Sequence, residues 1–138
     1  MDIRIQEEDI KKHLIGQLNP AYIILFGSFA KNTNHEESDI DLAFYPKEGS
    51  VPPKPYELFT IAQDLAHILK FEVDLVNLKS ASTVFKAQIY STGYLIYAED
   101  RFMFEKHQMT ALSMYAKLNE ERKSILERID ESGTIYEK

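Results

Sequence analysis

The sequence predicts an α/β (α+β) protein with a small mixed β-sheet, helices packed against it and a long C-terminal helix. Short apolar or alternating runs of strand length alternate along the chain with segments of helical periodicity. Hydrophobic residues make up 44% and charged residues 28%, the balance of an ordinary folded protein. With 138 residues the chain fits one domain, 1–138, with a core at about 6–98 and a helical extension at about 101–130.

The first half of the chain predicts one helix and two strands. Residues 6–18 are predicted to be helical, because isoleucine and leucine recur every four positions and a proline follows. Residues 21–26, AYIILF, form a continuous apolar run that Gly27 ends, as is typical of a buried strand. Residues 39–45, DIDLAFY, alternate, so we expect a strand with one face on the core.

A loop, a helix and a third strand follow. Residues 46–55 contain four of the five prolines and predict a loop. Residues 56–69 predict a helix, and residues 71–78, FEVDLVNL, alternate and predict a strand. The apolar stripe expected on this helix consists of Leu58, Ile61, Leu65 and Ile68.

The last part of the chain is mostly helical. Residues 82–92 predict a short helix closed by Gly93, and residues 94–97 a short strand or an extended tie. Residues 101–129 contain neither glycine nor proline, which predicts one long helix or two with a break near Asn119. About 28 residues of helix span roughly 42 Å, which is long for so small a domain.

Charge and composition exclude several classes of protein. The net charge of −6 arises wholly in residues 1–100, which contain 9 basic and 15 acidic residues, so we expect no binding to bulk nucleic acid. The absence of cysteine excludes disulfides and thiolate sites and favours a reducing cytoplasm. No apolar run approaches the length of a membrane span, and the N-terminal residues contain no hydrophobic signal core.

Two aspartates are the first candidates for chemistry. Asp39 and Asp41 are one residue apart on a predicted strand, with Ala43 next on the same face, so both carboxylates point the same way. Two carboxylates this close repel unless a cation lies between them, and Mg²⁺ prefers carboxylate, phosphate and water oxygens. The alternative is a solvated pair on an edge strand. Asp74, on the third strand, would complete a two-metal site if it joins them, and otherwise it is a surface residue.

A glycine and a serine follow the first strand. A strand, Gly27, Ser28 and a helix start can form a phosphate cradle, since glycine permits close backbone approach and the serine hydroxyl donates. The alternative is a plain helix N-cap. The two motifs together have the spacing G-S-x10-D-x-D, and the predicted elements around them agree with it.

The segment GSFAKNTNHEESDIDLAF, followed by FEVDLVNL, resembles the nucleotidyltransferase superfamily that includes DNA polymerase β. It is similar in particular to the minimal nucleotidyltransferases that are antitoxins of HEPN toxins, over about residues 20–118. The resemblance implies the polymerase β-type fold and Mg²⁺-dependent transfer of AMP from ATP to a tyrosine hydroxyl of a HEPN ribonuclease toxin.

The resemblance also implies roles for individual residues. Gly27 and Ser28 would hold the triphosphate of ATP, while Asp39 and Asp41 would bind two Mg²⁺ ions. Asp74 would bind one ion and help to deprotonate the attacking hydroxyl.

The chain departs from its relatives after the Gly-Ser turn, where many of them have Arg-Gly and this chain has Lys31 and Asn32. Asparagine tolerates a left-handed turn, so we expect the geometry to survive. For Lys31, His35 and Lys86 we leave the role open and favour solvated side chains.

Two other functions stay open: an antitoxin that blocks its toxin by docking alone, and a nucleotidyltransferase for a small molecule. The sequence leaves open the nucleotide, the acceptor residue and the stoichiometry with the toxin. We expect the tail beyond about Asn119 to contribute to binding the toxin.

Overall fold

The structure is a computed structural model that describes residues 6–35 and 38–132. At its centre lies a four-stranded sheet in the order β3-β2-β1-β4. β1 is antiparallel to both β2 and β4, whereas β2 and β3 are parallel, so the sheet is mixed as predicted. The strands are β1 (Tyr22–Phe26), β2 (Ile40–Tyr45), β3 (Val73–Asn77) and β4 (Tyr94–Ala98).

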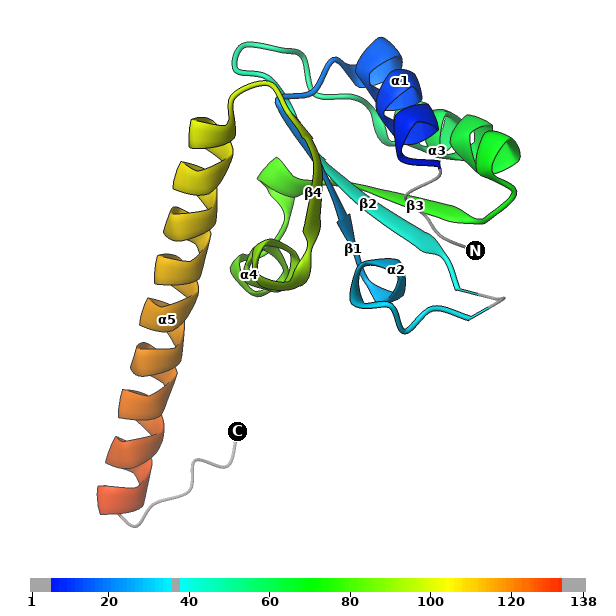
Figure 1. Cartoon of the computed structure of the whole chain (residues 1–138). Helices are drawn as coiled ribbons and strands as arrows, with labels where there is room; N and C mark the ends of the chain where they lie inside the picture. The colour runs from blue at the N-terminus through cyan, green and yellow to red at the C-terminus, as the bar shows by residue number, and fades with distance from the viewer. Residues whose placement is uncertain (1–5, 36–37, 133–138) are drawn as a thin grey trace.

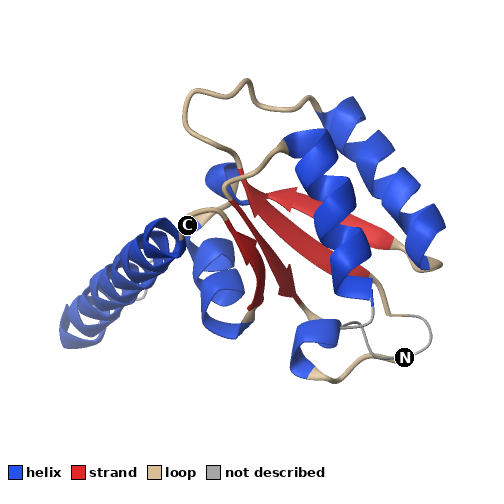
Figure 2. Ribbon diagram, turned by 45° about the horizontal axis from the view of Figure 1, so that its top comes forward, coloured by secondary structure: helices blue, strands red, loops and turns tan. Residues whose placement is uncertain are grey.

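Helices cover both faces of the sheet, as Figures 1 and 2 show. α1 and α3 pack on one face, and α4 and α5 pack on the other. The helices are α1 (Glu7–Leu18), the short α2 (Ser28–Lys31), α3 (Pro55–Leu69), α4 (Thr83–Thr92) and α5 (Arg101–Ser132), with a 3-10 turn, η2 (Leu78–Ser80), after β3.

The sheet is buried on both sides at β1 and β2. All five residues of β1 are buried, because alternate side chains enter one core cluster or the other. On β2, Ile40 and Leu42 enter the cluster under α1 and α3. Ala43 is also fully buried, on the opposite face. The expectation that only one face of this strand meets the core is therefore wrong, since α4 and α5 cover the other.

The buried stripe of α3 contains the predicted Ile61 and Leu65, whereas the predicted Leu58 is only half-buried and Leu69 takes the place of Ile68. Ile61, Leu65 and Leu69 are buried at intervals of four residues, together with the small Ala62. Ile68 is exposed, because the helix presents Leu69 to the sheet instead. The third strand is also shorter than predicted and begins at Val73.

α5 is one continuous helix of 32 residues with no break near Asn119. Its first half packs against α4 and the sheet, with Phe104 and Ala111 buried. Its second half projects beyond the rest of the molecule (Figure 1). Within the described residues, no helix is both long and apolar enough to cross a membrane.

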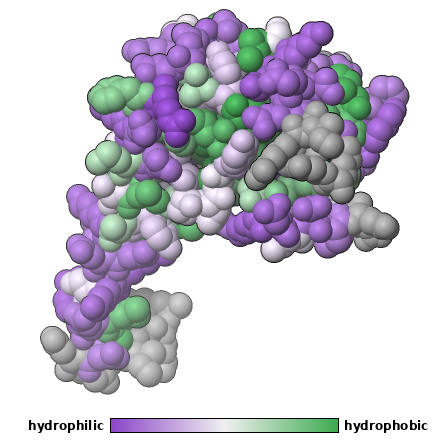
Figure 3. Space-filling view, in the orientation of Figure 1, coloured by the Kyte–Doolittle hydropathy of each residue, from purple (hydrophilic) through white to green (hydrophobic). Residues whose placement is uncertain are grey.

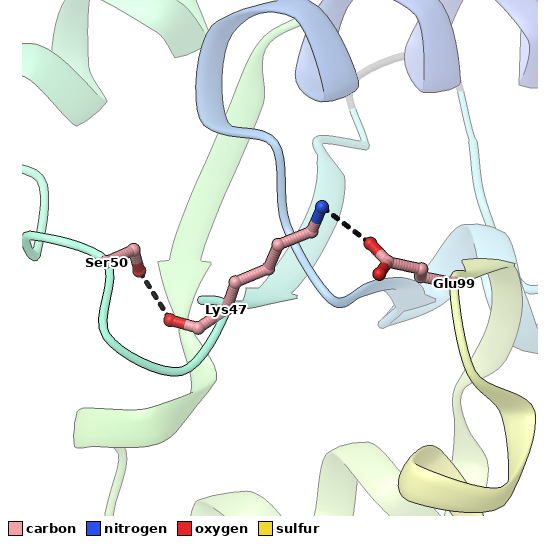
Figure 4. A network of polar contacts seen from close by, with 3 residues as sticks. All are labelled: Lys47, Ser50 and Glu99. Carbon is pink, nitrogen blue, oxygen red and sulfur yellow. Dashed lines mark hydrogen bonds and ion pairs between the residues drawn. The ribbon is translucent and has the colours of Figure 1, made fainter.

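Polar contacts tie the proline-rich loop to the segment between β4 and α5, at the end of the sheet where β2 and β4 finish (Figure 4). The Nζ atom of Lys47 lies 2.6 Å from Oε2 of Glu99. The Ser50 hydroxyl donates to the Lys47 carbonyl over 2.6 Å, and the Glu99 amide donates to the Ala21 carbonyl over 2.9 Å. These contacts fix the point from which α5 departs.

Candidate active site

The strands β2 and β3 bring two of the predicted aspartates together. Asp41 is the second residue of β2, and Asp74, the second residue of β3, is its direct neighbour in the parallel register. On its other side Asp41 pairs with Phe26, the last residue of β1. Asp39 stands one residue before β2 and is exposed, as is Asp74, whereas Asp41 is half-buried. The three aspartates therefore lie at the end of the sheet where β1 ends and β2 and β3 begin.

Asp41 shows the electrostatic consequence of this arrangement. Burial raises its pKa to about 6, and the negative charges of Asp74 and Asp39 add to the increase. Each of these effects disfavours the ionised carboxylate. A divalent cation would offset the repulsion, so the donor set fits a hard metal such as Mg²⁺.

Gly27 lies directly against Asp41. A Cβ atom added at Gly27 would stand 2.2 Å from Oδ2 of Asp41, which no real side chain permits. The backbone of Gly27 has φ 75° and ψ −154°, which favours glycine over any other residue. Glycine is thus required here because a side chain would collide with Asp41 and because the backbone has a positive φ.

The turn after Gly27 has the predicted form. Ser28 begins α2, whose single turn ends at Asn32 with φ 58° and ψ 31°, the left-handed conformation expected for asparagine. Lys31, at the end of α2, is exposed. The backbone of this turn therefore accommodates the Lys-Asn pair that replaces the Arg-Gly of many relatives.

The metal-binding geometry is not preassembled. In residues 6–35 and 38–132, no three acidic or imidazole side chains stand together in an arrangement that could already hold a metal ion. Asp39 precedes the strand and is exposed, so its side chain has room to turn. A cleft of about 440 Å³ opens beside it, and its other walls come from the end of α3 and the segment between α3 and β3. The cleft is lined by Ser38, Asp39, Gln63, Ala66, His67, Lys70, Phe71 and Glu72.

The remaining candidates lie away from the aspartates or on the surface. His35 is exposed in the loop before β2, where its amide donates to the Ser38 hydroxyl over 2.9 Å. Lys86 lines a separate cavity of about 140 Å³ with Tyr45, at the opposite end of β2 from Asp41.

The sequence did not predict a polar network between the sheet and α5. The buried Tyr22 hydroxyl contacts the Tyr90 hydroxyl and lies 2.9 Å from Nδ1 of His107. Burial raises the pKa of Tyr90 to about 12 and also raises that of Tyr22. Burial lowers the pKa of His107, and Lys106 and Lys86 lower it further, so the network is uncharged at neutral pH. No sequence signal indicated it, since Tyr22 and His107 are 85 residues apart.

A mixed sheet that carries neighbouring carboxylates beside a strand–Gly-Ser–helix turn defines a nucleotidyltransferase. The family model described as "Polymerase beta, Nucleotidyltransferase" matches residues 8–102. The chain belongs to this family, and the predicted polymerase β-type fold is confirmed.

Within this family, the chain is similar to proteins of toxin–antitoxin systems. The chain is 37% identical to "Protein adenylyltransferase MntA" of Shewanella oneidensis over 109 residues. This match covers 78% of the present chain and 74% of the relative. Its fold matches a crystal structure of a toxin–antitoxin with AMP-PNP, with a TM-score of 0.77, 33% identity and coverage of 89% and 97% of the two chains. It also matches a structure of the tri-AMPylated Shewanella oneidensis HEPN toxin in complex with MNT antitoxin, with a TM-score of 0.73, 30% identity and coverage of 91% and 97%.

Proposed function

We propose that this chain is an antitoxin that transfers AMP from ATP to a tyrosine hydroxyl of a cognate HEPN toxin. The observation that carries the proposal is the direct register of Asp41 with Asp74 beside Gly27, whose missing side chain leaves room for Asp41. The relatives named above support the donor, because one of their structures contains AMP-PNP, and the acceptor, because another contains an AMPylated HEPN toxin.

In the proposed site each residue has a definite role. Asp39 and Asp41 would hold two Mg²⁺ ions, and Asp74 would bind one of them. Bound Mg²⁺ supplies neutralisation of the phosphate charge and of the charge that develops in the transition state. Gly27 lets the triphosphate approach the backbone, and the Ser28 hydroxyl donates to it.

The reaction is an in-line displacement at the α-phosphorus. The tyrosine oxygen of the toxin forms a bond to the α-phosphorus while the bond to the bridging oxygen breaks and pyrophosphate leaves. Asp74 is exposed at the start of β3, so it can accept the proton of the incoming hydroxyl. We place the whole chain, core and helical extension together, in one domain that acts in the cytoplasm, where ATP is available.

An intact-mass measurement tests the proposal. The cognate HEPN toxin is incubated with the chain, ATP and Mg²⁺, and the expected result is a mass increase of one or more AMP groups on the toxin. Asp41→Asn should abolish the increase, whereas Asp64→Asn, which removes the same charge from an exposed position on α3, should preserve it. Protection of the toxin without any mass change would overturn transfer and favour docking alone.

A further inference from the structure

α5 extends past the end of the sheet at which the aspartates gather. β4 is antiparallel to β1 and therefore runs away from Gly27, and α5 then runs back toward it (Figure 1). Five residues of strand cover about 16 Å, whereas 32 residues of helix cover about 48 Å. The last 30 Å or so of α5 consequently project beyond the sheet on the side of the proposed active site.

One face of α5 carries a regular seam. Its positions follow alternating steps of four and three residues, the spacing by which one helix packs along another. The first positions are used within the chain, since Phe104 and Ala111 are buried and the Gln108 side chain donates to the Tyr90 carbonyl over 2.9 Å. The seam consists of Phe104, Gln108, Ala111, Tyr115, Leu118, Arg122, Ile125 and Ile129.

The far half of the seam is open to solvent at Arg122 and Ile125. We name the stretch from Leu118 to Ile129 the distal seam. Ile125 is 49% exposed there, and Leu126 beside it is 62% exposed. Figure 3 shows hydrophobic atoms near the end of the projecting helix, next to hydrophilic ones. A helix of this composition gains little stability in water unless something packs on it.

A groove leads from the body of the protein to the distal seam. It has a volume of about 350 Å³ and lies between α4 and α5. Leu112 and Tyr115 form its α5 side, one helical turn before Leu118. The α4 side consists of Val84, Ala87, Gln88 and Ser91.

We propose that the α4–α5 groove and the distal seam together dock an amphipathic helix of the toxin and so hold its acceptor hydroxyl beside the aspartates. This inference rests on the proposed function, because it assigns the surface to the protein that receives AMP. The steps of four and three residues select a helical partner, which would place its apolar stripe in the groove and along the seam.

Charge favours a partner other than a second copy of this chain. Each copy carries a net charge of −6, all of it outside residues 101–138, so two copies docked side by side repel. Asp39, Asp41, Glu72 and Asp74 lie at the end of the sheet that a docked protein would approach. A basic surface flanking the docked helix complements these residues.

The surface area available for contact also favours a partner other than a second copy of this chain. The projecting part of α5, about 20 residues, offers a strip of roughly 30 by 10 Å. That is well short of the approximately 800 Å² per side that a stable specific interface buries. A toxin that also occupies the α4–α5 groove and reaches the aspartates gains the remaining area.

Two matched variants of the full chain test the proposal. Ile125→Lys places a charge in the distal seam, and Met109→Lys makes the same change at an exposed α5 residue that belongs to neither the seam nor the α4–α5 groove. We measure the dissociation constant for the cognate HEPN toxin and AMP transfer at low and saturating toxin. Ile125→Lys should weaken binding about tenfold or more and slow transfer at low toxin only. Met109→Lys should change binding less than twofold.

The outcomes separate this proposal from the proposed function. Equal affinities of the two variants would overturn the docking surface, as would a dimer of the chain alone that Ile125→Lys dissociates in sedimentation. If the wild-type chain binds the toxin but transfers no AMP, the proposed function fails. The affinity comparison still decides where the toxin docks.

Discussion

Replacement of Asp41 by asparagine should stabilise the metal-free protein while abolishing AMP transfer. The pKa of Asp41 is raised from 3.8 to about 6 by burial and by the charges of Asp74 and Asp39. A carboxyl whose pKa is higher in the folded than in the unfolded state favours folding while it is protonated. That contribution is lost as the pH rises from about 4 through about 6. At neutral pH wild type therefore bears the cost of an ionised Asp41, and the asparagine variant does not.

The gain in stability expected for Asp41→Asn follows from the pKa shift of Asp41. Two pKa units correspond to an upper limit of about 3 kcal/mol. Asp41 is only half-buried, so solvent screening reduces this to about 1 kcal/mol. For a chain of this length that is an increase in Tm of about 4 °C.

Thermal unfolding in EDTA at pH 4 and pH 7.5 measures this difference. The variant should be more stable than wild type at pH 7.5, and the two should nearly coincide at pH 4. Asp64→Asn serves as the control, because it removes the same charge from an exposed site on α3. Added Mg²⁺ should stabilise wild type but not Asp41→Asn. A variant less stable than wild type at pH 7.5 without metal would refute the reasoning that the carboxylates repel.

Three further changes test the site and its support. Gly27→Ala should abolish ATP use, because the added Cβ would stand 2.2 Å from Oδ2 of Asp41. Pyrophosphate release at saturating ATP measures this effect. Release at the wild-type rate would show that the turn opens freely. Ser28→Ala should retain activity with a higher KM for ATP, by the loss of a donor worth about 0.5–1.5 kcal/mol, and an unchanged KM would exclude a phosphate contact. Tyr90→Phe should lower the free energy of unfolding, measured by urea denaturation, by about 1 kcal/mol, because the Tyr22 hydroxyl loses one hydrogen-bond partner. An unchanged free energy would mean that His107 alone satisfies the Tyr22 hydroxyl.

Local pattern was enough to predict most of the elements. The continuous run of residues 21–26 indicated a strand covered on both faces, and β1 is buried along its whole length. Asn32 was expected to support a left-handed turn and does. The absence of glycine and proline after residue 101 predicted a long helix, which α5 confirms. These features depend on backbone preference and on periodicity, which neighbouring residues set.

Local pattern was less reliable about which residues are buried. Ala43 was assigned to a face without a core, yet α4 and α5 cover it. Ile68 was assigned to the buried stripe of α3, where Leu69 lies instead. Burial depends on which helix packs on which face, and alternation within one segment contains no information about that.

The sequence by itself determined which side chains could bind a metal and phosphate: Asp39 and Asp41 on one segment, Asp74 on another, and the Gly-Ser turn. Only the tertiary structure decided that β3 lies beside β2 in parallel, which makes Asp74 the neighbour of Asp41. It also decided that α5 runs back toward this end of the sheet and that His107 joins the Tyr22 hydroxyl. The physical reason is that strand order and helix direction are set by long-range packing, in which residues far apart in sequence exclude water from a common core.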